Sequence, residues 1–498
     1  MLVIRPGLLR SSLFALAILA WPAAAGAGSL VNDVAHSLIA RGEPVTWIDG
    51  HRTGSAWKSS VGKPAYRTGR STGAAGIGLA LLGAYDTTGN ASYLSAAVAA
   101  GDFLAAAQVP ADSGRWPALY NPPGPSNEAF TSFEDGAPGI ADFLWQLYER
   151  TGNARYAFTA LAGMDWEISK AVAPKGQSCP PVCVWPVQDP PANGVQNGIA
   201  HGVAGIAWAF NAFAERRAGV DPVRSARYAA YARAAAAWLE AQMVHAKVAN
   251  GQSVARIPEE AGKDMVAPGF AAGSAGDAFL FYQLYLSTGR PQYRRDGDLL
   301  VAGLRADAVT DGSCAGVTWP ADSRNGKAVR ATGVERGNAG IGWAALQAYK
   351  LLITRQPALA IKDLELARAA GDWLLSPCAL QDRNKKENWV VDSRGRQVST
   401  TLANGAAGIG IFLYDLYSAT GSPSYSEGAA EARKWIASAA QRNRDDVYWC
   451  QSLRGGVWQS CGEPSWSRGE AGILDMAARL DGWALDVPGA ESGLERRR

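Results

Sequence analysis

The stretch HGVAGIA, His201–Ala207, contains two glycines three residues apart and opens a run of apolar residues. The same pattern, G-x-x-G followed by an apolar run, occurs seven times, and the leading glycines are 63 to 71 residues apart. These leading glycines are Gly73, Gly136, Gly202, Gly273, Gly337, Gly405 and Gly469. A regular spacing of this length indicates a repeat architecture, in which each repeat is one supersecondary unit.

Each repeat contains two expected helices. The apolar runs, such as IADFLWQLY from Ile140, are long and rich in leucine and alanine, which favours a buried helix over a strand. Four runs close on Y-x-x-T-G, whose glycine suits a left-handed C-cap. Alanine-rich amphipathic segments such as 228–242 follow. Seven apolar helices need cover on all sides, so the sequence predicts an all-α fold, an (α/α)7 double toroid formed by residues 28–485 as one domain.

The two ends of the chain differ from the repeats. Arg5 and Arg10 precede the apolar run LFALAILAW, and small residues near Ala25 and Ala27 offer cleavage points. This pattern predicts a signal peptide over residues 1–27, too short for a spanning helix, while residues 486–498 form a polar tail. We therefore expect a secreted or periplasmic monomer without a membrane span. The net charge of only +3 gives no reason to expect nucleic acid as a partner.

The six cysteines gain meaning from the expected export, because oxidising compartments favour disulfides. Cys179 with Cys183 and Cys450 with Cys461 are local pairs that suit short-loop bridges, which would leave Cys314 with Cys378. Six cysteines permit about fifteen connectivities, so the pairing stays open at this point. A zinc site at CPPVC is an alternative, although no second ligand pair lies nearby.

A tryptophan-containing, proline-rich segment precedes most of the motifs and reads as a loop or short hairpin. In these segments, aromatic faces could stack on sugars or peptide side chains, and Trp185 and Trp319 are our candidates for substrate contact. A structural role over one end of the helices is the alternative. The members of the series are Trp57, Trp116, Trp185, Trp319 and Trp389, with Ile257 in the fourth repeat and Trp449 or Trp458 in the seventh.

The residues immediately before the motif glycines should meet at one mouth of the ring, if the repeats are equivalent. For Thr72 and Asn404 we favour simple N-capping of the inner helix, and Asp135 could combine capping with a role in the site. Arg336 and Arg468 could bind a carboxylate or pair with Glu335 and Glu470. The full set is Thr72, Asp135, His201, Ala272, Arg336, Asn404 and Arg468.

Seven G-x-x-G helices, AHGVAGI around His201 and the repeated LYxxTGxxxY resemble the LanC-like family, the lanthionine synthetase C cyclases. The resemblance covers nearly the whole expected mature chain. It implies a zinc ion at the toroid mouth that activates a peptide thiol. The family places a cysteine two residues before one motif glycine and a Cys-His pair before the next. Here Glu335 stands in the first position and Ala403 and Asn404 in the second, so we expect no metal site and no zinc cofactor.

His201 matches the histidine that the family places directly before a motif glycine, although family members carry it one repeat later, where this chain has Ala272. We expect His201 to face the cavity and, with Glu134 and Asp135, to form an acid–base group. Arg336, Glu335, Arg468 and Asn404 would then contact substrate.

The sequence is consistent with two main functions, and a noncatalytic binding module that uses the same mouth is a third hypothesis. The first is an exported LanC-like protein that binds or modifies peptides without zinc. The second is a carbohydrate-active enzyme, a glycosidase or lyase acting on an oligosaccharide, since such scaffolds resemble α/α toroids and two-carboxylate chemistry needs paired acids. Candidate acids for it are Glu134, Asp135, Glu259, Glu260, Asp264 and Glu335.

Overall fold

The computed structural model describes residues 30–46, 52–59, 65–121, 124–191, 194–324, 327–380, 389–443 and 446–486. The expected signal peptide, residues 1–27, lies outside the described residues, as does the polar tail beyond Asp486.

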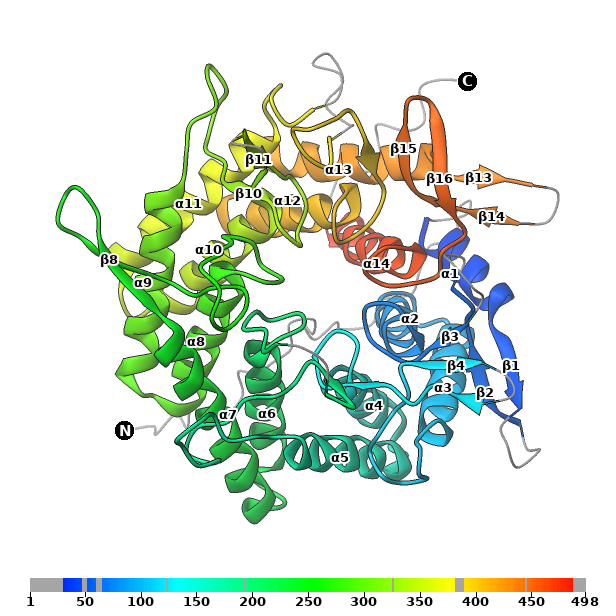
Figure 1. Ribbon diagram of the computed structural model, residues 1–498. Coiled ribbons are helices and arrows are strands. Elements are labelled where there is room, and N and C mark those ends of the chain that lie inside the picture. Colours follow the sequence, from blue (N-terminus) through cyan, green and yellow to red (C-terminus); the bar gives the residue numbers. More distant parts are fainter. Residues whose placement is uncertain are drawn as a thin grey trace, which may run out of the picture.

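The described chain forms two concentric rings of helices (Figure 1). The inner ring consists of α2 (Ala74–Thr88), α4 (Ala137–Thr151), α6 (Val203–Arg217), α8 (Ser274–Thr288), α10 (Asn338–Leu352), α12 (Ala406–Thr420) and α14 (Glu470–Asp486). The outer ring consists of α1 (Leu30–Arg41), α3 (Ala91–Ala106), α5 (Ala154–Ser169), α7 (Pro222–Gln242), α9 (Pro291–Asp307), α11 (Pro357–Leu374) and α13 (Pro423–Ser438). The α/α toroid predicted from the motif spacing is confirmed.

The ring closes by pairing the two ends of the described chain. Each inner helix contacts the next one, and α14 contacts α2. Six inner helices pack against the outer helix that follows them in sequence, while α14 packs against α1, the first helix of the chain. The closing pair is held by Arg41 of α1, which forms an ion pair with the buried carboxylate of Glu470 at the start of α14. Glu470 therefore pairs with Arg41, and the sequence-based pairing of Glu470 with Arg468 or Arg336 is wrong.

The turn between inner and outer helices follows from its repeated sequence. Gly89, Gly152, Gly289 and Gly421 are left-handed C-caps with φ between 67° and 69°, a conformation that glycine adopts without steric cost. The tyrosine four residues later lies on the next outer helix and is buried. Three of these hydroxyls donate to the preceding outer helix: Tyr93 to Asn32, Tyr156 to Asp102 and Tyr425 to Asp372. The motif thus joins neighbouring repeats on the outside of the ring.

The connections from outer to inner helices carry short antiparallel strands at one end of the toroid. Hairpins form between β1 (Glu43–Thr46) and β2 (Arg52–Ala56), β8 (Val244–Lys247) and β9 (Ser253–Arg256), β10 (Pro320–Arg324) and β11 (Lys327–Arg330), β13 (Gln441–Arg442) and β14 (Val447–Tyr448), and β15 (Cys450–Arg454) and β16 (Val457–Cys461). Other pairings involve β3 (Tyr66–Arg67), β4 (Leu119–Asn121), β5 (Gly124–Pro125), β6 (Ala129–Phe130), β7 (Gln188–Asp189) and β12 (Val398–Ser399). The pairings β3–β4, β6–β7 and β12–β15 link connections of neighbouring repeats.

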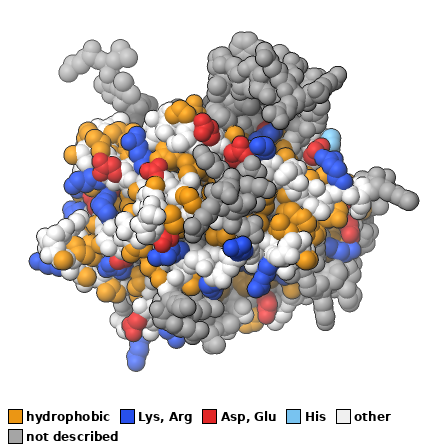
Figure 2. Space-filling view, turned by 90° about the horizontal axis from the view of Figure 1, so that it is seen from above, with side chains coloured by type: hydrophobic (Ala, Val, Ile, Leu, Met, Phe, Trp, Pro, Cys, Tyr) orange, Lys and Arg blue, Asp and Glu red, His pale blue; other side chains and the backbone are white. Residues whose placement is uncertain are grey.

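Three disulfides join Cys179 to Cys183, Cys314 to Cys378 and Cys450 to Cys461, so the pairing left open by the sequence is the one favoured by the local pairs. Cys179 and Cys183 are therefore not zinc ligands. None of the described helices combines the length and hydropathy needed to cross a membrane. On the face shown in Figure 2, acidic and basic side chains are interspersed.

Candidate ligand-binding and acid–base site

The inner helices begin at a tight turn that only glycine allows. Six of the seven leading motif glycines are the N-caps of their helices and have an extended conformation, and Gly469 directly precedes Glu470, the first residue of α14. A Cβ atom placed on Gly202 would lie 2.5 Å from the backbone of Gln196, and the other six leading glycines are as tightly enclosed. No side chain caps these six helices. The interpretation of Thr72 and Asn404 as N-caps is therefore wrong, because glycine occupies the cap position.

A closed ring of backbone hydrogen bonds links the seven turns. The residue two positions before each motif glycine donates its N–H to the carbonyl of the equivalent residue in the next repeat, at 2.7 to 3.0 Å. The order is Ser71 to Glu134, Glu134 to Ala200, Ala200 to Ala271, Ala271 to Glu335, Glu335 to Ala403, Ala403 to Ser467, and Ser467 back to Ser71. The side chains of the motif turns are thereby held at one level around a common axis.

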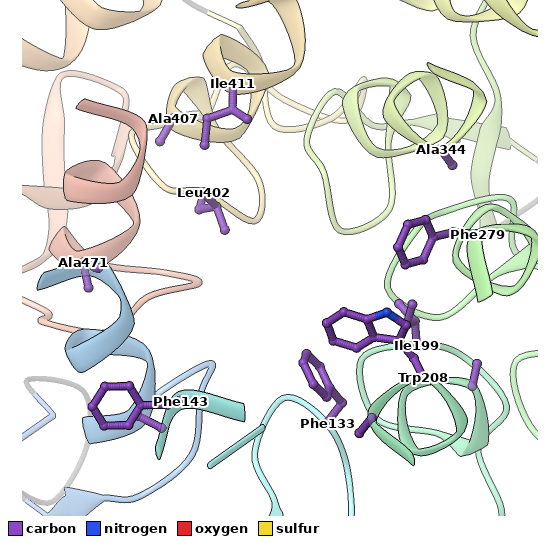
Figure 3. Close-up of a cluster of buried hydrophobic side chains, with 14 of the residues drawn as sticks. Phe133, Phe143, Ile199, Trp208, Phe279, Ala344, Leu402, Ala407, Ile411 and Ala471 are labelled. Atoms are coloured by element: carbon purple, nitrogen blue, oxygen red, sulfur yellow. The ribbon is translucent and has the colours of Figure 1, made fainter. Parts of the chain in front are cut away.

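A central cavity of about 170 Å³ lies inside this ring and is lined mainly by apolar side chains. All seven ring residues and all seven residues directly before them line it, together with side chains of the inner helices. Figure 3 shows Phe133, Ile199, Trp208 and Phe279 on one side of the opening and Leu402 and Ile411 across from them. The aromatic walls are packed edge to face, with ring centroids 4.5 Å apart for Phe133 and Trp208 and 5.2 Å for Phe270 and Trp343.

Glu134, Asp135 and His201 meet at the mouth of this cavity. His201 lines the cavity with 42% of its side chain exposed, and its Nδ1 lies 3.7 Å from Oδ2 of Asp135. Asp135 accepts a hydrogen bond of 3.1 Å from the Thr72 hydroxyl and does not itself line the cavity. His201 directly precedes Gly202 at the start of α6 and has the Asp135 carboxylate as its neighbour.

Glu134, one of the seven ring residues, also lines the cavity. Desolvation by the surrounding protein raises the pKa of Glu134, and the neighbouring Asp135 adds to this, while His201, Ser71 and Arg70 oppose it. The raised pKa means that this carboxyl holds its proton more tightly than an ordinary glutamate does, and His201 offers a second group that can exchange protons.

The second polar group lies on the opposite part of the ring. Glu335 accepts a hydrogen bond of 3.1 Å from the Asn404 amide and lies 3.7 Å from Nη2 of Arg468. Glu335 and Arg468 line the cavity, whereas the exposed Arg336 does not. Asn404 does not line the cavity and contributes to the site through its hydrogen bond to Glu335.

The loop tryptophans have a structural role. Trp185 and Trp319 are 2% and 1% exposed, so their faces are closed to a substrate and the expectation of substrate contact is wrong. Their indole N–H groups donate to carbonyls in the last turn of an outer helix, Glu167 and Leu304. The same bond occurs from Trp57 to Leu38, Trp116 to Leu104, Trp389 to Leu374 and Trp449 to Ile436. Each of these indoles thus fixes its loop to a carbonyl near the C-terminal end of an outer helix.

The positions at which the LanC-like family holds zinc do not fit a metal here. Glu335 is engaged by Asn404 and Arg468, the methyl group of Ala403 offers no donor atom, and the amide nitrogen of Asn404 points to Glu335. Among the described residues no group of three or more His, Cys, Asp or Glu side chains could hold a metal ion. We derive no step through zinc.

Several cavity residues were missed in the sequence. The residue three positions before each motif glycine lines the cavity, and six of the seven are apolar: Phe133, Ile199, Phe270, Val334, Leu402 and Trp466. The seventh is Arg70. An alignment of the seven motifs extended by three residues would have shown both the apolar set and the exception.

Residues 322–481 match the family model described as Lanthionine synthetase C-like protein. The resemblance to the LanC-like family is confirmed over this segment. It contains the last three motifs, with Glu335, Asn404 and Arg468 of the candidate site. No curated protein matches the chain.

The solved structure of nisin cyclase is similar in fold, with a TM-score of 0.50, 12% identity, and coverage of 83% of this chain and 89% of that chain. A sugar epimerase from a ruminal bacterium gives a TM-score of 0.48 and 10% identity, covering 91% of this chain and 97% of that chain. An α-1,6-mannanase of Salegentibacter gives a TM-score of 0.42 and 12% identity, covering 83% of this chain and 99% of that chain. The likeness to nisin cyclase supports the toroid fold, and the other two are too distant to support an argument.

Proposed function

We propose that this chain is an exported LanC-like protein that binds peptides at the mouth of the toroid, seating an apolar side chain in the central cavity without zinc-dependent cyclisation. The observation that carries the proposal is the apolar cavity below a rim of acid–base groups. Export is supported by the signal-peptide pattern of residues 1–27 together with three disulfides.

The size and lining of the cavity favour a hydrophobic side chain as the bound group. Its volume of about 170 Å³ is close to that of the roughly 150 Å³ apolar cavities that accept benzene. A sugar ring would bring several hydroxyl groups against Phe270, Trp343 and their neighbours. Each hydroxyl left without a hydrogen bond costs about 1–3 kcal/mol. The lining therefore favours a peptide side chain over an oligosaccharide.

The rim supplies the chemistry for any modification of the bound peptide. Glu134, with its raised pKa, is the candidate proton donor, and His201, held by Asp135, is the candidate acceptor. Glu335 and Arg468 offer one carboxylate and one guanidinium to the peptide backbone or to its charged groups. These roles need hydrogen-bond reach and no metal.

The proposal is tested by comparing acetyl-Gly-Gly-Phe with acetyl-Gly-Gly-Gly in titration calorimetry, with tryptophan fluorescence as a second readout because Trp208, Trp343 and Trp466 line the cavity. Burying a phenyl group stabilises the complex by about 1.5–3 kcal/mol, so the Phe peptide should bind about 10- to 100-fold more tightly.

The matched variants are Ala271→Leu, which fills the cavity from the ring, and Ala91→Leu, which adds the same atoms to the exposed start of α3. Ala271→Leu should abolish the preference for Phe, and Ala91→Leu should leave it unchanged. Equal binding of the two peptides by the unmodified protein, or a preference for the Phe peptide that survives Ala271→Leu, would contradict the proposal.

A further inference from the structure

Arg70 is the one charged side chain among the seven residues three positions before the motif glycines, and it lies in the cavity wall. Its guanidinium centre lies over the rings of both Phe133 and Trp466, 4.9 Å from each centroid. The side chain is only 7% exposed. Contact with two aromatic rings and burial restrict the orientation of this guanidinium and of its N–H donors.

The hydrogen bonds of Arg70 leave most of this edge unused. Its Nη1 donates to Oδ2 of Asp142 at 3.1 Å, and within the described residues this is the one acceptor that its guanidinium has. A guanidinium carries about five N–H donors. Asp142 does not line the cavity, so the pair anchors one edge of Arg70 from behind.

The charges around Arg70 do not balance. Asp142 is shared with Arg216, whose Nη2 lies 2.8 Å from Oδ1. One carboxylate thus faces two guanidiniums, all three side chains being at least 85% buried. The arginines hold the pKa of Asp142 below its usual range despite its burial, so it remains ionised. One positive charge is left uncompensated in a site where unpaired charge is costly.

Two other carboxylates of the cavity do not supply the missing charge. Glu134 forms no ion pair or hydrogen bond with Arg70 among the described residues, and desolvation raises the pKa of its carboxyl although Arg70 opposes this. Glu335 is engaged by Arg468 and Asn404. A ligand anion that reaches the free edge of Arg70 would complete the balance, because planar carboxylates match the donor geometry of arginine.

We infer that the ligand of the central cavity carries a carboxylate joined to an apolar group, and that Arg70 binds this carboxylate. The inference rests on the proposed function, in which the ligand is a peptide. The ligand is then the C-terminus of a peptide whose last residue is apolar: its side chain fills the aromatic cavity and its terminal carboxylate contacts Arg70. A free aromatic acid presents the same chemistry, and the experiment separates the two sources.

The experiment measures the affinity of four probes by titration calorimetry: acetyl-Gly-Gly-Phe as the acid and as the amide, and 3-phenylpropionate with 3-phenylpropanamide. Hydrogen bonds to a charged group predict that the peptide acid binds about 10- to 100-fold more tightly than its amide. This comparison uses the unmodified protein and does not depend on the folding of a variant.

The variants assign the preference to Arg70. Arg70→Met should remove the preference for the acid, and Arg70→Lys should reduce it, because lysine keeps the charge and loses the planar edge. Arg216→Met is the matched control: Arg216 shares Asp142 with Arg70 but does not line the cavity, so this variant should keep the preference.

Equal affinity for acid and amide in the unmodified protein would overturn the inference, as would a preference retained in folded Arg70→Met. If neither peptide binds, but 3-phenylpropionate binds more tightly than its amide and Arg70→Met removes this difference, the carboxylate inference stands and the peptide proposal fails. If the Phe and Gly peptides differ but acid and amide do not, the peptide proposal stands and the inference fails.

Discussion

Asp277 offers a sharp test of the repeat-based account of the fold. It lies four residues after the motif glycine Gly273, a position at which the other six repeats carry isoleucine. The side chain is 1% exposed, and neither carboxylate oxygen has a hydrogen-bond partner among the described residues. Desolvation alone raises the pKa of Asp277 well above its ordinary value of 3.8. The folded protein therefore holds the proton more tightly than the unfolded chain does.

The sign of the pH effect follows from this difference. Above the unfolded pKa of 3.8 the folded state binds more protons at this site, so stability falls as the pH rises towards the raised folded pKa. A fully coupled single proton gives a slope of about 1.4 kcal/mol per pH unit. Asp277→Asn removes this titration, and Asp277→Ile also restores the residue of the other repeats. Relative to both variants, the unmodified protein should lose up to about 1.4 kcal/mol per unit as the pH rises from 3.8 towards the raised folded pKa.

The assay is urea denaturation at several pH values, comparing the free energy of unfolding of the four proteins. Asp264→Asn, at an exposed aspartate, is the matched control and should follow the unmodified protein at every pH. Parallel pH profiles for the unmodified protein and Asp277→Asn would refute the reasoning. They would mean that the carboxylate is solvated or paired in the folded state.

Three further predictions concern the rim, the tryptophans and the disulfides. Ionisation of Glu134 places negative charge near Arg70, so the affinity for acetyl-Gly-Gly-Phe acid should fall as the pH rises above 4.5. Glu134→Gln should make the affinity less dependent on pH. A calorimetric pH series in which the two proteins behave alike would contradict this prediction. Trp319→Phe removes the donor of the 2.7 Å hydrogen bond to the Leu304 carbonyl and should lower the free energy of unfolding by about 1–3 kcal/mol without changing peptide affinity. Unchanged stability together with weaker peptide binding would instead indicate that Trp319 contacts substrate. Replacing Cys314 and Cys378 by alanine removes a disulfide between residues 64 apart and should lower the free energy of unfolding by about 4 kcal/mol. Replacing Cys179 and Cys183, which are 4 residues apart, should lower it by about 2 kcal/mol. Equal losses of stability in thermal unfolding would show that loop length does not set the effect.

The fold was readable because one steric requirement recurs seven times. A Cβ at Gly73 or at Gly202 would collide with the preceding turn, so the glycine spacing reports the number of inner helices directly. The meeting of Asp135 with His201 was predictable for the same reason, since both residues directly precede a motif glycine and equivalent positions of a closed ring face one axis. The pairing of α1 with α14 was not, because it depends on where the ring closes.

The errors came from residue types whose alternative roles share one spacing. A tryptophan that stacks on a ligand and one that satisfies a helix carbonyl both recur once per repeat, and only burial separates Trp185 from a binding residue. Thr72 resembles an N-cap in sequence, but the glycine after it occupies that position and Thr72 donates to Asp135 instead. Arg70 was passed over because it lies outside the seven-residue motif.

The central claim is that the cavity inside the seven-membered ring binds the apolar side chain of a peptide. Photo-crosslinking tests it most directly: acetyl-Gly-Gly-Xaa acid, with a diazirine on a side chain of leucine size at Xaa, is irradiated with the protein and the attached residues are mapped by mass spectrometry. The account predicts attachment to cavity residues such as Phe270, Trp343 and Ile411, suppressed by excess acetyl-Gly-Gly-Phe and by Ala271→Leu. Attachment confined to the outer helices or the hairpins, unaffected by Ala271→Leu, would contradict it.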